Sequence, residues 1–474
     1  MTTREETGGP APQSDEGNVD AAALAAAVDG RMGQTISTLE QLVAIPGIAW
    51  EAFDPADLLH SAETVADLIR GLGIEDVQVL SVAQGEKPGG PAVVARRPAA
   101  PGKPTVLLYA HHDVQPPGDL SLWKTEPFAA TEIDGRLYGR GAADDKAGIM
   151  AHVGAVEALL ASQGDDFGLG LTFFIEGEEE AGSPTFRSFL ETHRELLQAD
   201  VIIVADSGNW RVGVPALTTS LRGLVDGVVE LQVLDHAVHS GMFGGPILDA
   251  PTLLARLIAT FHDETGAVAI EGLVGTESAA VDYPESDFRR DSSVLESVQL
   301  AGTGPIADRL WNKPALSIIG MDVPSVALSS NTLLPSARAK LSLRLAPGQD
   351  PAAAVEALAA HVDAHAPFGA KVRFVPGEQG SAFATDTTAP AAQAALWALG
   401  KAWGTGPVET GVGGSIPFIA DLTELYPAAQ ILITGVEDPD SRAHSANESL
   451  HLGDFRNAIL AEALLLARLD SEGL

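Results

Sequence analysis

The chain has 474 residues and carries a formal net charge of −35, because its 64 acidic residues far outnumber its 29 lysines and arginines. A chain this acidic repels phosphate backbones and anionic lipid surfaces, which argues against nucleic acid and membrane partners. It contains no cysteine, so disulfides, cysteine nucleophiles and thiolate zinc sites are excluded, and any bound metal must be held by His, Asp and Glu. The length exceeds what one hydrophobic core usually supports and predicts two domains.

The first segment, residues 1–18, is acidic and rich in Gly, Pro and Thr, and this composition predicts a disordered tail. It lacks a basic region followed by an apolar stretch, which is the pattern of a signal peptide. The apolar stretches elsewhere are too short or too interrupted to span a bilayer. We therefore expect a cytoplasmic protein.

From Leu58 to about Ser220, strand-like and helix-like segments alternate, which is typical of an α/β layer structure. Short, almost purely apolar runs in this part, and one near the C-terminus, read as central strands buried on both faces. The runs cover residues 106–110, 171–175, 201–205 and 430–434. We expect a central, mostly parallel sheet flanked by helices, built from residues 19–220 and 384–474.

The pattern changes between these two parts, over residues 221–383. Alternating strand patterns at 225–233 and 337–345 enclose a helical pattern at 249–261 and a charged, irregular stretch from 276 to 300. This section predicts an inserted α+β domain.

Metal-ligand-type side chains follow the apolar runs, and open parallel sheets place their sites at the carboxyl ends of their strands. His111 and Asp113 are two apart on an extended segment and point the same way, so His111 could bind a metal while Asp113 supports it. His112 should point elsewhere. The alternative is a polar strand end without a ligand.

Asp144 follows the glycine-rich loop Gly139-Arg140-Gly141 and opens the next predicted helix. A carboxylate here could bridge two cations, since each oxygen can serve a different ion. On local evidence alone, an ordinary helix cap is the better interpretation.

The acidic cluster from Glu176 to Glu180 lies between an apolar run and a helical pattern. Like charges this close repel in a low-dielectric cleft unless a cation neutralises them, although a solvated acidic loop is the alternative. With a metal present, one glutamate can bind it while its neighbour takes a proton from water. Asp206 and His444 would complete the ligand set, and the joint occurrence of these motifs carries the argument.

Together these motifs resemble, in order and spacing, the di-zinc exopeptidase family of aminoacylases, carnosinases and cytosolic nonspecific dipeptidases. The resemblance runs from about Ile45 to near the C-terminus. It rests on His111-x-Asp113, Gly139 to Lys146, Glu176 to Ser183, Asp206, His239-Ser240-Gly241, Gly413 to Pro417 and Ala443-His444-Ser445.

The resemblance implies two divalent ions per subunit, with zinc expected first and manganese or cobalt as alternatives. One ion would be bound by His111 and Asp206 and the other by Glu180 and His444, with Asp144 bridging them. Glu179 is implied as the general base and Asp113 as the supporting residue beside the His111 metal. The Asp144-Asp145 peptide bond is expected to be cis by the same analogy.

The inserted domain is implied to act as a lid and a dimerisation domain, so we expect a homodimer. His239 would stabilise the oxyanion. The residues implied to hold the substrate are Asn331, Thr332 and Arg344 on the lid, together with Ser415 and the glycines before it. An arginine suits this task because its fork donates two parallel hydrogen bonds to a carboxylate.

The activity that follows is metal-dependent hydrolysis of unblocked dipeptides by a metal-activated water, with Glu179 as the base. The long inserted domain favours the dipeptidase and carnosinase branch. The alternative is an amidohydrolase of N-acylated or N-carbamoylated amino acids. A non-catalytic scaffold is disfavoured because every matched position retains a chemically competent residue.

Overall fold

The computed structural model describes residues 19–83, 85, 88–414 and 417–474. The tail predicted for residues 1–18 and the candidate Ser415 lie outside these residues. The chain divides into two compact units. We call residues 1–218, 385–408 and 422–474 the main unit, and residues 219–384 and 409–421 the inserted unit.

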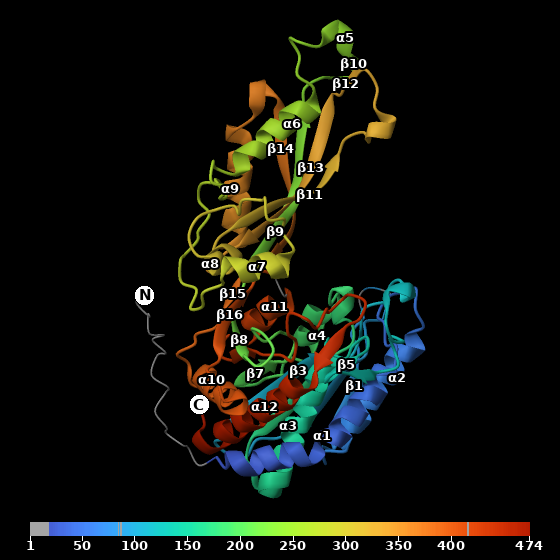
Figure 1. The fold of residues 1–474 in the computed structure, drawn as a ribbon, viewed down its shortest axis with the longest axis vertical. Helices are drawn as coiled ribbons and strands as arrows, with labels where there is room; N and C mark the ends of the chain where they lie inside the picture. Colours follow the sequence, from blue (N-terminus) through green and yellow to red (C-terminus); the bar gives the residue numbers. More distant parts are fainter. Residues whose placement is uncertain (1–18, 84, 86–87, 415–416) are drawn as a thin grey trace, which may run out of the picture. The chain divides into compact units, whose positions relative to one another are not determined.

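The main unit is built around a mixed sheet in which the neighbouring strands run β1-β2-β6-β3-β7-β17-β8 (Figure 1). Its centre is parallel, because β6–β3, β3–β7 and β7–β17 pair in the same direction. On the flanks, β1–β2, β2–β6 and β17–β8 are antiparallel. The strands are β1 (Asp76–Leu80), β2 (Ala92–Arg97), β3 (Thr105–His111), β6 (Gly170–Glu176), β7 (Val201–Val204), β8 (Ala216–Leu221) and β17 (Gln430–Ile433).

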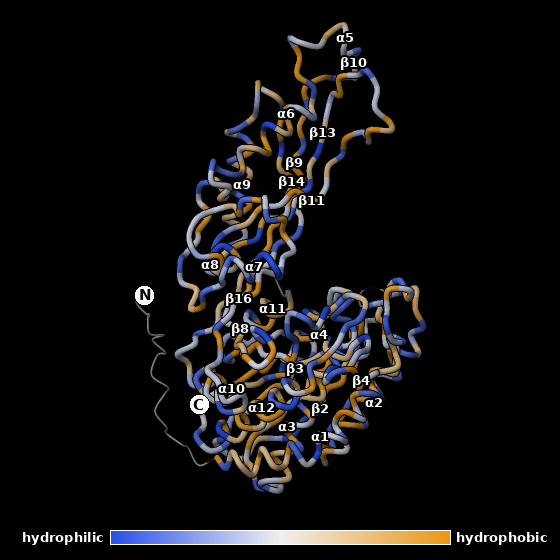
Figure 2. Tube along the Cα trace, in the orientation of Figure 1, coloured by the Kyte–Doolittle hydropathy of each residue, from blue (hydrophilic) through white to orange (hydrophobic). Residues whose placement is uncertain are grey.

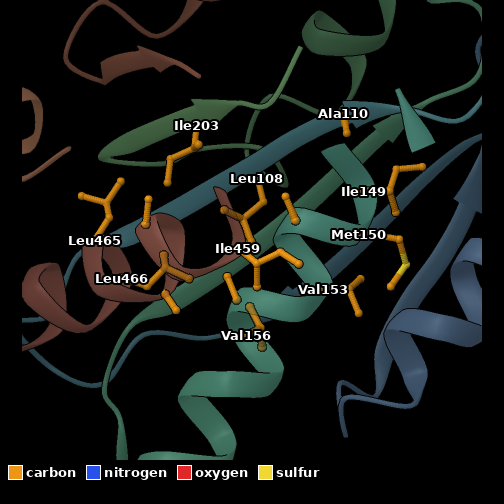
Figure 3. Close-up of a cluster of buried hydrophobic side chains, with 14 of the residues drawn as sticks. Leu108, Ala110, Ile149, Met150, Val153, Val156, Ile203, Ile459, Leu465 and Leu466 are labelled. Carbon is orange, nitrogen blue, oxygen red and sulfur yellow. The ribbon is translucent and has the colours of Figure 1, made fainter. Parts of the chain in front are cut away.

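The four parallel strands are the four apolar runs of the sequence, and they are buried because helices cover both faces of the sheet. On β3, Leu108 faces the helical layer of α3 and α12, in the cluster that Figure 3 shows with Val153 and Ile459. Tyr109 points to the opposite face, where its ring meets the edge of the Phe174 ring at a centroid distance of 5.6 Å. The predicted parallel centre is therefore confirmed.

Figure 2 shows hydrophobic residues concentrated along these strands and the helices beside them. The main helices of this unit are α1 (Ala21–Val43), α2 (Pro55–Arg70), α3 (Lys146–Gln163), α4 (Phe186–Thr192), α10 (Pro390–Trp403) and α12 (Leu452–Glu472).

Helix α3 begins unusually close to the end of β7, and Gly148 permits this approach. A Cβ atom at Gly148 would lie 2.7 Å from the Ala205 carbonyl oxygen and 2.1 Å from Oδ1 of Asp145. Only a residue without a side chain fits there. The first turn of α3 is thereby held beside the segment that leads to Asp206.

A small antiparallel sheet of β4 (Thr131–Ile133), β5 (Arg136–Tyr138) and β18 (Ser449–His451) joins two distant loops. Ser449 pairs with Tyr138. The loop after β5 leads to Asp144, and the loop before β18 contains His444. This sheet therefore brings two candidate ligands together across about 300 residues of sequence.

The inserted unit contains an antiparallel sheet in the order β11-β13-β9-β14. Helices α6 and α9 pack on one face, where alternate β13 residues such as Leu341 and Leu343 are buried. Two short strands, β10 and β12, pair separately. The strands are β9 (Gly223–Gln232), β10 (Val238–His239), β11 (Ala315–Asp322), β12 (Thr332–Leu333), β13 (Ser336–Leu345) and β14 (Lys371–Gly380). The helices are α5 (Ser240–Phe243), α6 (Ala250–Ile258), α7 (Glu285–Ser292), α8 (Ile306–Trp311) and α9 (Pro351–Ala364). The connecting segments carry β15 (Phe383–Ala384), β16 (Val408–Val412) and α11 (Pro417–Leu425).

Candidate metal centre

Six of the predicted side chains form two groups whose ligand atoms lie within 4.8 Å of one another. One group is His111, Glu179 and Asp206, and the other is Asp144, Glu180 and His444. His111 is the last residue of β3, and Asp206 follows β7. The groups therefore lie at the carboxyl edge of the parallel strands, where the topology predicts a site.

Asp144 connects the two groups, because its two carboxylate oxygens face different histidines. Oδ1 lies 3.0 Å from Nε2 of His111, and Oδ2 lies 3.0 Å from Nε2 of His444. The alternative sequence interpretation, a helix cap, fails for both aspartates here. Helix α3 is preceded by Asp145, whose side chain makes no capping bond, and the Asp144-Asp145 peptide bond is cis, as expected.

His111 is fully buried and held in one orientation by its neighbours. Its Nδ1 lies 3.1 Å from the carbonyl oxygen of Asp113, and because a carbonyl only accepts, Nδ1 must carry the proton. Nε2 is therefore the ring nitrogen left to bind a metal, and it faces Oδ1 of Asp144. The backbone N–H of His111 donates to Oδ2 of Asp145 at 3.1 Å. The orienting hydrogen bond on the far nitrogen is the arrangement usual for a metal-binding histidine.

Asp113 has a second task, which is to fix the acidic turn after β6. Its two carboxylate oxygens accept the backbone N–H groups of Glu179 and Glu180, each at 3.1 Å. These two glutamates begin a short 3-10 helix, Glu179–Ala181. Their side chains diverge, so that Glu179 joins the His111 group and Glu180 joins the His444 group.

Glu180 is held by Gln115 as well as by His444. The backbone N–H of Gln115 donates to Oε1 of Glu180 at 3.2 Å, and the Gln115 side-chain amide donates to Oε2 at 2.7 Å. Nε2 of His444 lies 3.1 Å from the same Oε2. The hydrogen bonds that His444 donates to the carboxylates of Asp144 and Glu180 raise its pKa to about 11.

The loop that carries His444 adopts a left-handed backbone at three non-glycine residues, Arg442, His444 and Asn447. Such conformations cost energy and persist where neighbouring contacts impose them. Asn447 supplies two of these contacts: it accepts the N–H of Lys124 at 2.7 Å and donates to the carbonyl of Leu122 at 2.9 Å.

The site holds more negative charge than its own cations balance. Burial raises the pKa of Glu179 to about 9 and that of Asp206 to about 6, with neighbouring carboxylates adding to the effect. Glu437, on the loop after β17, has its pKa raised well above normal by burial and by the Asp144 and Asp206 charges. Carboxylates and imidazoles that share so much unbalanced charge fit hard or borderline divalent cations.

The predicted lid residues lie in the inserted unit, and three of them are neighbours. His239 pairs with Thr332 across β10 and β12, and the Asn331 carbonyl accepts the N–H of Ser240 at 3.0 Å. Arg344 lies on β13, away from that pair of strands. Burial lowers the pKa of Arg222 to about 10, and the positive charge of Arg344 contributes to this shift.

The sequence did not single out four residues that contact or charge the two ligand groups or the predicted lid residues. They are Gln115, Arg222, Glu437 and Glu448. Gln115 and Glu448 had a signal, because each lies within four residues of a predicted site residue. Arg222 and Glu437 had none, since a single charge after a strand is usually solvated.

The family model for Peptidase family M20/M25/M40 matches residues 107–468. A cysteinylglycine-S-conjugate dipeptidase of Corynebacterium striatum is 37% identical over 368 residues, covering 77% of this chain and 80% of the relative. The human Beta-Ala-His dipeptidase is 30% identical over 361 residues, covering 71% and 70% of the two chains.

Solved structures with the same fold include two dipeptidases. Human carnosine dipeptidase 1 is similar with a TM-score of 0.74 and 25% identity, covering 96% of this chain and 99% of that one. A dipeptidase of Saccharomyces cerevisiae shares the fold with a TM-score of 0.74 and 23% identity, covering 96% and 99%.

The fold and site thus define a metal-dependent hydrolase built on a two-unit α/β scaffold. The chain belongs to Peptidase family M20/M25/M40, and the relatives that it resembles there include dipeptidases. Within the described part of the chain, no helix has both the length and the apolar character to cross a membrane.

Proposed function

We propose that this protein hydrolyses the peptide bond of unblocked dipeptides with the help of two divalent ions. Zinc is the ion we expect first, with manganese or cobalt as alternatives. The observation that carries the proposal is the carboxylate of Asp144, whose oxygens each face the histidine of a different group at 3.0 Å. One ion would be held by His111 and Asp206, the other by Glu180 and His444, with Asp144 between them. The dipeptidase activities named for the relatives support the substrate class.

When bound, such ions polarise a carbonyl and lower the pKa of a water. Glu179 is the residue of this chain that moves the proton. Its Oε2 lies 4.0 Å from Nε2 of His111, and its backbone is fixed by Asp113. A carboxylate in this position can accept a proton from the attacking water and pass it to the leaving amine.

The inserted unit supplies the groups that hold the substrate in this proposal. His239 stabilises the oxyanion, and Asn331, Thr332 and Arg344 bind the substrate's carboxylate. The effect of Arg344 on the pKa of Arg222 supports an anion-binding role, because two guanidinium groups that repel each other are stabilised by a carboxylate between them. Ser415 is proposed to add contacts near the substrate.

A homodimer through the inserted unit, in the cytoplasm, completes the proposal. The edge strand β11 and its neighbouring loop leave large hydrophobic side chains in solvent, which is typical of a protein–protein contact surface. These are Ile319, Met321, Val323, Val326 and Leu328.

The test is hydrolysis of a substrate panel by metal-stripped protein to which zinc or manganese is returned. The panel contains Ala-Ala, β-Ala-His, S-methyl-Cys-Gly and N-acetyl-alanine, and a Glu179→Gln variant is the matched control. We expect metal-dependent cleavage of the free dipeptides and little with the variant. Cleavage confined to N-acetyl-alanine would replace the dipeptidase with an amidohydrolase, and near-normal turnover by a metal-loaded Glu179→Gln protein would remove Glu179 from the mechanism.

A further inference from the structure

Three segments that carry candidate ligands meet at one backbone oxygen, the carbonyl of Tyr109. This oxygen accepts the N–H of Ala205 at 3.0 Å, and it lies 2.9 Å from Nε2 of His152. Tyr109 belongs to β3, Ala205 follows β7, and His152 is in α3. These segments lead to His111, Asp206 and Asp144, respectively.

The side chain of Tyr109 reaches a fourth segment. Its hydroxyl donates to Oε2 of Glu176 at 2.6 Å, and both residues are buried. Glu176 ends β6 and directly precedes the turn that carries Glu179 and Glu180. Small movements of Tyr109 would therefore change the spacing of ligands on four segments together.

His152 holds this carbonyl in place and is itself held from α12. Its ring is fully buried, with Nδ1 2.7 Å from Oε1 of Glu462. Both ring nitrogens thus face acceptors, a carbonyl and a carboxylate, and an imidazolium satisfies both. Burial alone would lower the pKa of His152, but the Glu462 charge and hydrogen bond raise it above its ordinary value.

We propose that His152 and Glu462 are positioning residues that set the metal-ligand geometry through the carbonyl of Tyr109. This inference rests on the proposed metal centre. Neither side chain is among the ligand groups, and both act through β3 and β7. Removing a residue that orients a metal ligand without binding the metal itself typically weakens metal affinity about 10- to 100-fold.

A purely structural role would make different predictions. In that case any loss of packing between α12 and the sheet would weaken metal binding to a similar extent. Leu466 offers the matched control, because it is fully buried on α12 four residues after Glu462 and lies in the cluster of Figure 3. Leu466→Ala removes core contacts without touching the hydrogen bonds to Tyr109.

The experiment is a zinc titration of the metal-stripped full-length proteins against a chromophoric chelator, with denaturant unfolding of each. We expect His152→Leu to lose about 10- to 100-fold in zinc affinity, and Glu462→Gln about 10-fold. Leu466→Ala should be destabilised while keeping its zinc affinity. In His152→Leu and Glu462→Gln, the kcat for Ala-Ala should fall together with the zinc affinity, and the KM should stay the same.

Equal losses of zinc affinity in His152→Leu and Leu466→Ala would overturn the proposal. Should His152→Leu fail to fold, the comparison of Glu462→Gln with Leu466→Ala decides in the same way. A wild-type protein that binds no zinc would overturn the metal centre and this proposal with it. A wild-type protein that binds zinc but cleaves no dipeptide would overturn only the proposed function.

Discussion

Arg140 and Glu448 form an ion pair inside the main unit, with Nη1 2.5 Å from Oε2. The other oxygen of Glu448 accepts the backbone N–H groups of Ala143 and Asp144 at 3.0 and 3.1 Å. The pair lies between the glycine-rich loop and the end of the His444 loop, and it is almost completely buried. One carboxylate therefore neutralises a buried cation and also fixes the backbone from which Asp144 projects.

Replacing Glu448 with Gln should destabilise the protein strongly, because it leaves the Arg140 charge buried without a counterion. Breaking a buried pair in this way costs about 3–5 kcal/mol. Denaturant unfolding of the metal-free protein measures the loss. Glu424→Gln is the matched control, because Glu424 pairs with Arg187 on the surface and such pairs contribute about 0–1 kcal/mol. Equal effects would show that the buried pair is not important for stability.

Glu179→Gln should lower kcat by about 10²- to 10⁴-fold, the usual range for removing a positioned general base. Zinc content should remain close to that of the wild type, because the amide is similar in size and the turn is held by Asp113 through backbone groups. Kinetics with Ala-Ala and metal analysis of the same sample test this together. A variant that lost its zinc would instead assign Glu179 to metal binding.

Removing the metal should destabilise the main unit, since the carboxylates around Asp144 then repel one another without a cation. Zinc at 100 times its Kd should raise the free energy of unfolding by about 2.7 kcal/mol. The gain should shrink from pH 8 to pH 5, because the raised pKa of His444 makes protons compete with the ion. Thermal unfolding with and without zinc at both pH values provides the measurement, and a gain independent of pH would argue against histidine ligands.

The His152–Glu462 pair should stabilise the fold more at low pH than at high pH. The folded-state pKa of His152 is raised above the unfolded value of 6.5, so its contribution is complete below pH 6.5 and is lost as pH rises through the folded-state pKa. The difference in unfolding free energy between wild type and Glu462→Gln should therefore be larger at pH 6 than at pH 9. Denaturant unfolding at the two pH values checks the sign, and the opposite trend would mean that His152 is neutral in the folded protein.

Arg344→Met should raise the KM for Ala-Ala, because one of the groups proposed to bind the substrate's carboxylate is lost. A charge-assisted hydrogen bond of this kind contributes about 1.5–3 kcal/mol, roughly 10- to 150-fold in kcat/KM. Arg338→Met is the control on the same strand, since Arg338 pairs with Asp322 in solvent. Steady-state kinetics that change equally in the two variants would exclude a specific role for Arg344.

The sequence predicted the parallel centre of the sheet well, because runs such as residues 201–205 are apolar on both faces and admit few other structures. It also predicted the helical pattern at 249–261, which became α6 (Ala250–Ile258) followed by a 3-10 helix, Ala259–Phe261. The antiparallel flanks were missed. Strand β2 begins with an apolar run, Ala92 to Ala95, as the parallel strands do, and direction is set by distant pairing rather than by local pattern.

For the site, the motifs gave the residue types but not their partners. That Asp144 faces both histidines depends on two loops joined by β5 and β18, which no local spacing reveals. The contact between His152 and Glu462 was equally invisible, because a histidine on an apolar helix reads as an ordinary core residue.

Strand β17 lies between β7 and β8 in the finished sheet, yet it follows the whole inserted unit in the chain. During synthesis, β7 must therefore wait with one edge unpaired until this late strand emerges from the ribosome, and His444 comes later still. A nascent chain of this peptidase would be prone to aggregation at that edge but unable to cut peptides, so activity would begin only after β17 and the His444 loop have been made.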